Sequence, residues 1–439
     1  MTGKTDGCCG GAGAPASPRM WTVDEHLADV LSHMAPLPAI ELPLLEAQGC
    51  RLAEDAVAEV DLPPFDNSSM DGYALRTADT ARATGQYPSV LAVVGDIAAG
   101  AGELPKVGPG QAARIMTGAP VPPGAEAVAP VEWTDGGTGT GLAADSMGAQ
   151  GGDRAADQEV RVLRPVGEGA HIRRRGSDVT AGDTVLTAGT VLGPTQLGLL
   201  AAIGRGTVRV RPRPRVVVLS TGSELVQPGE PIGPGQISDS NSFTLTAAAR
   251  DAGAIAYRVG GVPDDAAVLR GVLEDQLGRA DLIVTSGGVS VGAYDVVKEV
   301  FADYGGVDFR RLRMQPGKPQ GFGRIGGADG VPLLTLPGNP VSAYISFELF
   351  VRPVIRTMLG AADVHRPVVR AVCTTALRSP AGRRQFLRGR YADGEVTPVG
   401  GEGSHLVGAL ARADCLITVP EDETALPAGS TVDVVLLAD

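Results

Sequence analysis

Apolar residues recur along the chain with different periods, and the changes of period divide it into regions. Within 20–34 they return at helical spacing behind Thr22, which predicts a helix capped by Thr22. Within 63–165 short β-like runs alternate with Gly and Pro clusters, which predicts a small β domain inserted into another domain's chain. Strand, loop and helix patterns alternate over 215–359, and short apolar runs over 367–438 predict a second β domain.

The alternating region predicts a layered domain. We expect strands at 216–220, 282–286 and 333–336, and helices at 243–252, 267–277, 296–304 and 341–359. Alternation of this kind is typical of a three-layer α/β domain with a mainly parallel sheet. The predicted fold class is therefore multidomain α/β plus β, and ligands are expected at the carboxyl ends of the parallel strands.

Composition removes several function classes. The formal charge of −12 and the aromatic content of 4% argue against a nucleic-acid surface and against binding to an anionic membrane. No apolar run reaches the ~20 residues of a membrane span. The five cysteines include no Cys-x-x-Cys pair, so neither a disulfide framework nor a zinc site is expected. We therefore expect a cytoplasmic protein.

Hydroxyls, glycines and carboxylates fill four loops of the predicted α/β domain. Glycines let backbone N–H groups approach a phosphate, and helix N-termini add positive potential. Carboxylates beside such a site would repel phosphate unless a divalent cation bridges them, which indicates Mg²⁺. Its candidate ligands are Asp239, Asp295 and Glu224. The four loops are Ser220-Thr221-Gly222-Ser223-Glu224-Leu225, Gln236-Ile237-Ser238-Asp239-Ser240-Asn241, Thr285-Ser286-Gly287-Gly288-Val289-Ser290-Val291-Gly292-Ala293-Tyr294-Asp295, and Leu336-Pro337-Gly338-Asn339-Pro340-Val341-Ser342.

Purely structural interpretations exist for each of these features. Asp239 and Asp295 precede predicted helices, where an Asp is commonly a cap. The Pro337–Pro340 segment makes a turn with Pro at the first helical position. Lys318 lies between two prolines that restrict its backbone, which suits binding an anion but is also compatible with an exposed turn.

Two polar segments upstream carry the same ambiguity. Asp71-Gly72, within a stretch rich in short polar groups, is compatible with a hairpin turn. Three consecutive arginines at 173–175 indicate either a solvated face or a polyanion site.

Taken together, these segments resemble the molybdopterin molybdenumtransferase family, the last enzyme of molybdenum-cofactor assembly. The resemblance covers 21–437, and its markers occur in order as FDNSSMDGYA, MTGAPVP, HIRRRGSD, STGSEL, GQISDSN, TSGGVSVGAYD, QPGKP, LPGNPVS and GEGSH. It implies a homodimer and the Mg²⁺-dependent insertion of molybdate into adenylylated molybdopterin (molybdopterin-AMP), with release of AMP. The implied domains are a tail at 1–19, an elongated domain at 20–62 and 165–205, an inserted β domain at 63–164, a molybdopterin-binding α/β domain at 206–362 and a C-terminal β-barrel-like domain at 363–439.

The resemblance also assigns residues. It implies that Asp239 and Asp295 are the acidic residues of the α/β pocket, and that the dimer partner brings Asp71 and Thr117 to it. Lys318, Arg383 and Ser404 match an oxyanion patch for molybdate. The full candidate set is catalytic Asp71, Thr117, Asp178, Asp239 and Asp295, and substrate-binding Ser220, Thr221, Gly222, Glu224, Ser286, Gly287, Gly288, Lys318, Pro337, Gly338, Asn339, Pro340, Ser342, Arg383 and Ser404.

Two positions depart from the family pattern. Ser177 precedes Asp178 where many members have Glu, and Gln315 stands where many have Lys. These departures keep open a non-catalytic cofactor carrier or scaffold. A molybdopterin adenylyltransferase, which consumes ATP, also stays open because the α/β domain alone resembles that enzyme. The expected partners are molybdopterin-AMP, a second copy of the chain, the adenylyltransferase and recipient molybdoenzymes, with neither nucleic acid nor membrane.

Overall fold

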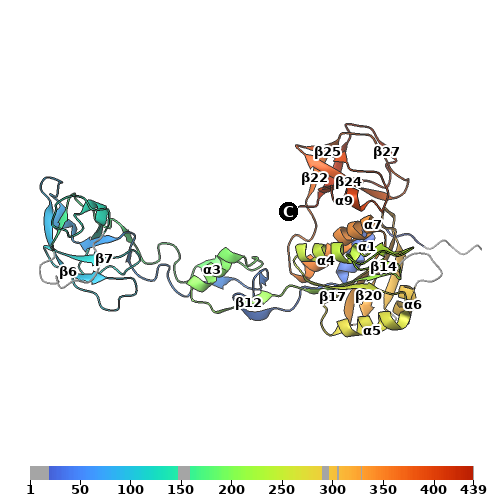
Figure 1. Ribbon diagram of the computed structural model, residues 1–439, viewed down its shortest axis with the longest axis horizontal. Coiled ribbons are helices and arrows are strands. Elements are labelled where there is room, and N and C mark those ends of the chain that lie inside the picture. The colour runs from blue at the N-terminus through green and yellow to red at the C-terminus, as the bar shows by residue number, and fades with distance from the viewer. Residues whose placement is uncertain (1–18, 147–158, 289–295, 304–305, 328, 439) are drawn as a thin grey trace, which may run out of the picture. The chain divides into compact units, whose positions relative to one another are not determined.

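The computed structural model describes residues 19–146, 159–288, 296–303, 306–327 and 329–438 (Figure 1). Its contacts divide the chain into two compact units. Unit 1 is Met1–Ile40, Gly49–Arg51 and Arg209–Asp439, and unit 2 is Glu41–Gln48 and Leu52–Val208. The boundary between the two units lies within three strands: β1 (Ile40–Pro43), β2 (Arg51–Leu52) and β12 (Thr207–Arg211). Every helix among the described residues is too short or too polar to span a bilayer.

A six-stranded sheet is the centre of the α/β part of unit 1. Its order is β16-β13-β17-β21-β20-β18. The first four strands in this order are parallel, and the last two pair antiparallel, so the prediction of a mainly parallel sheet is confirmed. The strands are β13 (Arg215–Thr221), β16 (Ile255–Val262), β17 (Leu282–Ser286), β18 (Val307–Arg311), β20 (Pro319–Ile325) and β21 (Val331–Leu336).

Helices cover both faces of this sheet, as expected for three layers (Figure 1). Successive residues of a strand point to opposite faces. Val217 and Leu219 of β13 accordingly pack in a core with α5 (Ala266–Leu277) and α6 (Val296–Asp303). Val216 and Val218 pack in the opposite core, which includes residues of α1, α4 and α7. Those helices are α1 (Val23–Ser32), α4 (Asn241–Asp251) and α7 (Pro340–Ser346).

Helix α1 begins where its sequence predicts. The Thr22 side chain accepts a hydrogen bond from the Glu25 N–H, and the Glu25 carboxylate accepts one from the Thr22 N–H. This reciprocal capping satisfies two N–H groups that have no partner within the helix.

The single helix predicted at 341–359 is divided in three. After α7 the chain forms a π-helix at Phe347–Val351, followed by α8 (Arg352–Met358). Pro353 explains the change, because it has no N–H to donate and its ring clashes with the carbonyl four residues earlier. Wider π-helical turns accommodate that carbonyl without ending the helix.

Three strands of the sheet, β16, β18 and β20, were absent from the sequence prediction, and glycines interrupt the apolar patterns of β16 and β20. In β20, a Cβ at Gly321 would lie 2.0 Å from Thr335 Oγ1, and one at Gly323 would lie 1.9 Å from the Gly306 carbonyl oxygen. Strand β16 contains Gly260 and Gly261, and β18 follows Gly306 directly. Gly321 and Gly323 of β20 are required by close packing against neighbouring groups and not by a turn. A single sequence does not distinguish these two reasons for a glycine.

The C-terminal part of unit 1 is a closed five-stranded barrel. Its strands pair in the order β24-β25-β22-β28-β26, and β26 pairs again with β24. Closure leaves no free sheet edge. These strands are β22 (Val368–Cys373), β24 (Arg384–Ala392), β25 (Glu395–Pro398), β26 (Cys415–Val419) and β28 (Thr431–Leu436). Shorter elements of unit 1 are β14 (Leu225–Val226), β15 (Ile237–Ser238), β19 (Met314–Gln315), β23 (Leu377–Arg378), β27 (Ala425–Leu426) and α9 (Val407–Leu410).

Unit 2 contains a five-stranded sheet with both faces buried. Alternate residues of β5 enter opposite cores, Tyr73 and Leu75 on one face and Ala74 on the other. The hairpin-turn interpretation of Asp71-Gly72 is wrong, because Gly72 begins β5, and a Cβ there would lie 2.0 Å from the Ala129 carbonyl oxygen. The sheet runs β8-β5-β7-β6-β9, with β5 (Gly72–Leu75), β6 (Ser89–Ile97), β7 (Gln111–Ile115), β8 (Ala127–Pro130) and β9 (Glu159–Val162).

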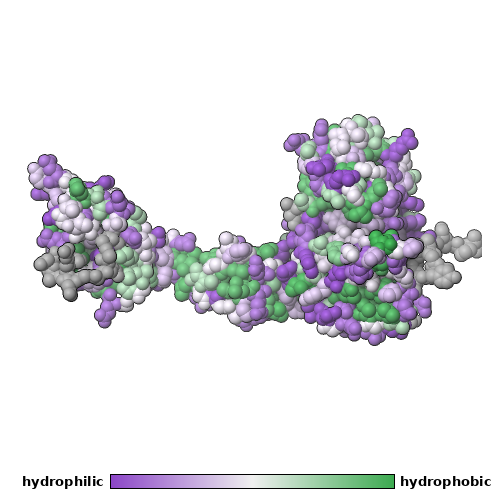
Figure 2. Space-filling view, viewed as in Figure 1, coloured by the Kyte–Doolittle hydropathy of each residue, from purple (hydrophilic) through white to green (hydrophobic). Residues whose placement is uncertain are grey.

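The rest of unit 2 consists of short elements and exposed apolar surface. Its remaining elements are β3 (Ala56–Val57), β4 (Asn67–Ser68), β10 (Ile172–Arg173), β11 (Thr184–Leu186), α2 (Thr77–Thr80), α3 (Pro194–Ala202) and a 3-10 turn at Val131–Trp133. Figure 2 shows apolar side chains at the surface of the segment that carries α3. Leu45, Val57, Val60 and Val191 of unit 2 are all exposed.

Candidate functional site

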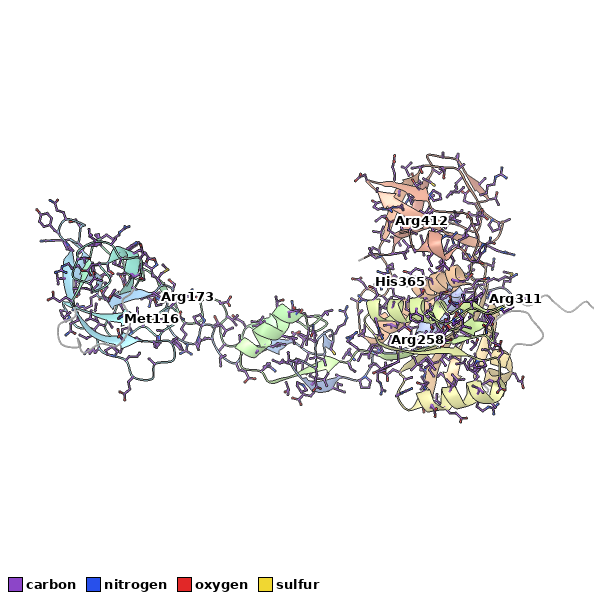
Figure 3. The ribbon with its side chains drawn as sticks, viewed as in Figure 1. Met116, Arg173, Arg258, Arg311, His365 and Arg412 are labelled. Atoms are coloured by element: carbon purple, nitrogen blue, oxygen red, sulfur yellow. The ribbon has the colours of Figure 1, made fainter. Side chains whose placement is uncertain are left out.

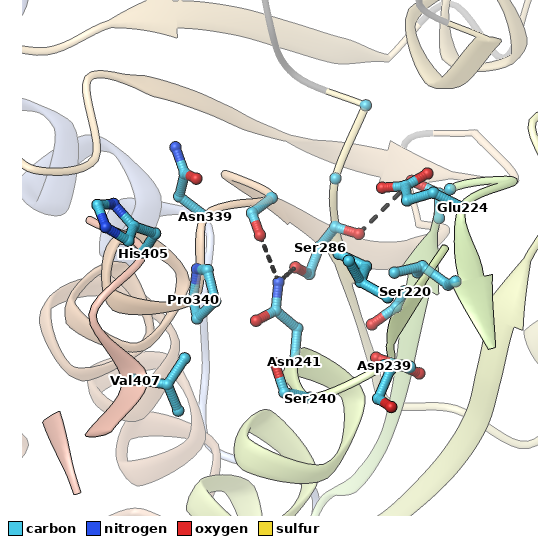
Figure 4. Close-up of a pocket in the computed structure, with 18 of the residues that line it drawn as sticks. Ser220, Glu224, Asp239, Ser240, Asn241, Ser286, Asn339, Pro340, His405 and Val407 are labelled. Carbon is cyan, nitrogen blue, oxygen red and sulfur yellow. Dashed lines mark hydrogen bonds between the residues drawn. The ribbon is translucent and has the colours of Figure 1, made fainter. Parts of the chain in front are cut away.

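The carboxyl ends of β13 and β17 open into a cavity of about 760 Å³, here called the acidic pocket. Glu224 and Asp239 line one side of it, and Asn339, Pro340 and His405 line the other (Figure 4). Its described lining contains three carboxylates and no Lys or Arg. The lining residues are Ser220, Thr221, Gly222, Glu224, Leu225, Ile237, Ser238, Asp239, Ser240, Asn241, Asp264, Ser286, Gly287, Gly288, Gly338, Asn339, Pro340, His405 and Val407.

Glycine is required where the β13 and β17 loops meet. Gly287 has φ +103°, and a Cβ there would lie 2.5 Å from the Thr221 carbonyl oxygen. Any larger residue would force the two loops apart. Thr221 Oγ1 in turn donates to the Ser286 carbonyl oxygen at 3.5 Å. The Gly-rich loop therefore serves close packing of the pocket wall, besides leaving its backbone accessible.

Asn241 joins the β17 and β21 loops. Its Nδ2 donates to Ser286 Oγ and to the Gly338 carbonyl oxygen, both at 2.7 Å (Figure 4). A side-chain amide carries two N–H donors, and here both are used within the pocket. Asn241 begins α4, so one residue fixes the relative places of a helix start and two strand ends.

Asp239 is 1% exposed and its carboxylate is fixed by neighbours. Its Oδ1 accepts from the Ser242 N–H at 3.1 Å and its Oδ2 from the Ser242 hydroxyl at 2.5 Å. Arg258 Nη1 lies 3.8 Å from Oδ2, and Arg258 also packs over the Phe243 ring, at 4.3 Å from its centroid (Arg258 is labelled in Figure 3). Donors and positive charge of this kind offset the cost of burying a carboxylate. Asp239 thus makes a bond typical of a helix cap while also lining the pocket.

The donor set of the acidic pocket fits a magnesium ion with substrate phosphates better than an all-protein metal cage. The described residues contain no cluster of three or more His, Cys, Asp or Glu side chains arranged for a metal. Mg²⁺ is usually held by one or two carboxylates together with phosphate oxygens and water, which Asp239 and Glu224 can supply in part. The third candidate ligand, Asp295, lies outside the described residues.

A second cavity of about 550 Å³, here called the cationic pocket, adjoins the first and shares Gly338 and Asn339 with it. Lys318 and Arg383 are its cations, and Ser342 and Ser404 line it as well. Its other lining residues are Met314, Gln315, Pro316, Gly317, Pro319, Pro337, Glu402 and Gly403.

The two neighbouring arginines at the start of β24 have different surroundings. Arg383 lines the cationic pocket, and its Nη1 donates to Gln315 Oε1 at 3.2 Å. Arg384 instead forms ion pairs with Asp24 at 2.8 Å and Glu421 at 3.2 Å. Arg383 is consequently the arginine placed to meet an anion in this pocket.

The turn before α7 forms the wall between the pockets. Asn339 is the N-cap residue of α7, yet its side chain makes no capping bond. The Val341 N–H donates to the Ser404 carbonyl oxygen at 3.0 Å, which holds the barrel loop with Ser404 against the start of α7. Gly338 and Asn339 of this turn line both cavities.

Three predicted catalytic residues lie in unit 2. Asp71 Oδ1 accepts from the Thr117 N–H at 2.7 Å, so the structure brings these two together. Asp178 is exposed. Of the three consecutive arginines, Arg174 pairs with Asp66 at 2.7 Å and Arg175 pairs with Asp61, so two of the three side chains are paired within the chain.

Several lining residues were absent from the set of candidate site residues: Ser240, Asn241, Asp264, His405 and Val407 in the acidic pocket, and Glu402 in the cationic pocket. Asn241 and His405 lie inside the GQISDSN and GEGSH segments and could have been found there. The sequence around Asp264 does not indicate a site. Asp264 is held at the pocket by a residue distant in sequence, Ser223, whose N–H donates to its Oδ2 at 3.1 Å.

Comparison with known families covers almost the whole chain. Residues 21–204 match the MoeA N-terminal region (domain I and II), 217–357 match a probable molybdopterin binding domain, and 370–437 match the MoeA C-terminal region (domain IV).

Known relatives and solved structures agree. Molybdopterin molybdenumtransferase 2 of Mycobacterium tuberculosis is 47% identical over 94% of this chain and 99% of its own. Molybdopterin molybdenumtransferase of Haemophilus influenzae is 35% identical over 94% and 98%. The crystal structure of a molybdopterin biosynthesis MoeA protein from Pyrococcus horikoshii has 31% identity and a TM-score of 0.73, covering 96% of this chain and all of that one. The chain therefore belongs to the MoeA family of molybdopterin molybdenumtransferases, transferases of molybdenum cofactor biosynthesis.

Proposed function

We propose that this enzyme inserts molybdate into adenylylated molybdopterin in a Mg²⁺-dependent reaction, releasing AMP and the molybdenum cofactor. The observation that carries the proposal is the pairing of two adjoining cavities of opposite character. One is lined by carboxylates, hydroxyls and glycines, and the other by Lys318 and Arg383, with Gly338 and Asn339 common to both.

The acidic pocket would hold the pterin nucleotide. Backbone groups of the Gly-rich loops and the hydroxyls of Ser220 and Ser286 are suited to phosphate oxygens. Asp239, with Glu224 and Asp295, would hold Mg²⁺, which when bound neutralises phosphate charge. Ser242 and Arg258 keep the Asp239 carboxylate in one orientation.

The cationic pocket would hold molybdate. Lys318 presents a point charge, Arg383 presents a planar fork of N–H donors, and Ser342 and Ser404 add hydroxyls. Two cations, Lys318 and Arg383, outnumber the single carboxylate, Glu402, so this pocket attracts a doubly charged oxyanion, which the carboxylates of the acidic pocket repel. The dithiolene sulfurs come from the substrate, so the site needs no cysteine of its own.

The shared wall would bring the two substrates together. Because Gly338 and Asn339 line both cavities, groups bound on either side lie next to each other. Holding both reactants in place makes their reaction effectively unimolecular, so the entropy cost of a bimolecular encounter no longer adds to the barrier.

One assay tests the proposal. Purified protein is incubated with Mg²⁺, molybdate and adenylylated molybdopterin, and AMP and molybdenum cofactor are measured. The expected result is AMP release that depends on both molybdate and Mg²⁺. Consumption of ATP with formation of adenylylated molybdopterin would identify an adenylyltransferase instead, and stoichiometric retention without turnover would identify a carrier.

We also propose a homodimer in the cytoplasm, in which Asp71 and Thr117 of one copy, with Asp178, act in catalysis on the other copy's substrate. Exposed apolar side chains of unit 2 support association, because such residues commonly mark interfaces. Sedimentation equilibrium tests the dimer, and mixing Asp71→Ala with Asp239→Ala protein tests for activity regained in hybrids. The adenylyltransferase and recipient molybdoenzymes are the proposed protein partners.

A further inference from the structure

A hydrogen-bonded ribbon of three segments underlies the cationic pocket. The Trp21 N–H donates to the Arg311 carbonyl oxygen at 3.0 Å, and the Arg313 N–H donates to the Trp21 carbonyl oxygen at 2.7 Å. On the other side, the Arg384 N–H donates to the Arg313 carbonyl oxygen at 2.9 Å, and β19 pairs parallel with β24. The segment before α1 is thereby joined through the segment that carries β19 to barrel strand β24.

This ribbon carries the polar groups of the cationic pocket. Gln315 ends β19, and Arg383 directly precedes β24. The Leu312 N–H donates to the Lys318 carbonyl oxygen at 2.8 Å, which closes the turn that presents Lys318. Lys318 comes from the α/β part of unit 1 and Arg383 from the barrel, so their separation depends on how the two parts are joined here.

Helix α1 adds a bidentate ion pair to this junction. Arg384 Nη1 and Nη2 donate to Asp24 Oδ1 and Oδ2, each at 2.8 Å, and Arg384 Nε lies 3.2 Å from Glu421 Oε1. Parallel paired bonds between guanidinium and carboxylate fix orientation as well as distance. The pKa of Asp24 is held below its usual range, first by its hydrogen bond from Arg384.

Fixing Arg384 constrains Arg383. The two residues share a peptide bond at the entry to β24, so holding Arg384 toward α1 limits where the Arg383 backbone can lie. There Arg383 lines the cationic pocket and donates to Gln315 Oε1. We propose that Asp24 is a positioning residue for the oxyanion site: through Arg384 it sets the place of Arg383 and hence the affinity for molybdate. The identity of the anion rests on the proposed function.

The test compares two variants of the same helix. Asp24→Asn removes the charge that holds Arg384, whereas Asp29→Asn breaks the pair of α1 with Arg310, 2.6 Å apart, and leaves Arg384 untouched. For Asp24→Asn we expect the KM for molybdate to rise about tenfold with kcat changed less than twofold. A misplaced Arg383 weakens the binding of molybdate in the ground state and in the transition state alike, which raises KM and leaves kcat nearly unchanged. Asp29→Asn should leave the KM for molybdate within twofold of wild type.

Two further measurements keep the outcome decisive. The conservative variant Asp24→Glu, which keeps a carboxylate for Arg384, should regain most of the affinity that Asp24→Asn loses. Calorimetric titration with molybdate alone should show the same order of affinities. Equal KM values for wild type and Asp24→Asn, or equal shifts in both single variants, would overturn the inference. If the wild-type protein releases no AMP, the proposed function fails, and the molybdate titration still decides whether Asp24 positions an anion site.

Discussion

The acidic and the cationic pocket are neighbours, yet they are built in different ways. The acidic pocket is formed mainly by loops at the carboxyl ends of parallel strands of one sheet, tied together by Asn241. The cationic pocket takes Lys318 from one part of unit 1, Arg383 and Ser404 from the barrel, and Ser342 from α7. The barrel contributes His405 and Val407 to the first, whereas it contributes a cation, Arg383, to the second. The comparison shows that one part of the fold can supply both kinds of pocket, and that the cationic pocket gains its second cation, Arg383, only from the barrel.

The largest expected effect comes from the buried carboxylate of the acidic pocket. Asp239→Asn keeps the shape and one acceptor but removes the charge that would hold Mg²⁺. We expect kcat to fall about 10³-fold, the size found when one group of a preorganised site is removed. AMP release at saturating molybdate measures this.

A matched control exists on the next helix. Asp265 caps α5 by accepting from Ala267 and Val268, both at 2.9 Å, and it is absent from the pocket lining. Asp265→Asn should keep full activity because Asn caps nearly as well. If both variants lose activity alike, Asp239 acts only as a structural residue.

The next effect should be confined to the cationic pocket. Lys318→Met removes a charge while keeping the length of the side chain, and we expect kcat/KM for molybdate to fall about 10²-fold, near 3 kcal/mol. The KM for the pterin substrate should change little. Lys106→Met, at an exposed position of unit 2, is the control. An equal loss for both substrates would break the proposed division of labour between the pockets.

A smaller effect should reach both pockets at once. Asn241→Asp is nearly isosteric but cannot donate to Ser286 Oγ and the Gly338 carbonyl oxygen. We expect about a tenfold loss in kcat/KM for each substrate, because Gly338 lines both cavities. Initial rates with each substrate varied in turn measure this. An effect on only one substrate would show that the shared wall does not couple the sites.

The smallest effect concerns the scaffold that holds the pockets. Burial lowers the pKa of His26 on α1 to about 4, from an unfolded value near 6.5. Between these values the unfolded chain binds more protons, so stability is highest above pH 6.5 and falls as the pH drops toward 4. Between pH 7 and 5 this costs about 2 kcal/mol. Urea unfolding of wild type and His26→Leu should show a steeper loss for wild type. Parallel pH profiles would contradict the assignment.

The sequence predicted most of what depends on local pattern. The helix behind Thr22, strands β13 and β17, and the mainly parallel sheet follow from apolar period and capping residues, and the structure confirms them. The residues at the strand ends could be proposed together because parallel strands share one edge. Their chemical roles, including that of Asp295, stay predictions.

What the sequence could not give depends on contacts between distant segments. The glycines of β20 look like loop residues until Thr335 and the Gly306 carbonyl are seen against them. Arg383 and Arg384 are adjacent and chemically identical, yet Arg383 lines the cationic pocket while Arg384 pairs with Asp24 and Glu421. Local propensity and period determine the elements and their order, whereas the place of a charge is set by neighbours hundreds of residues away.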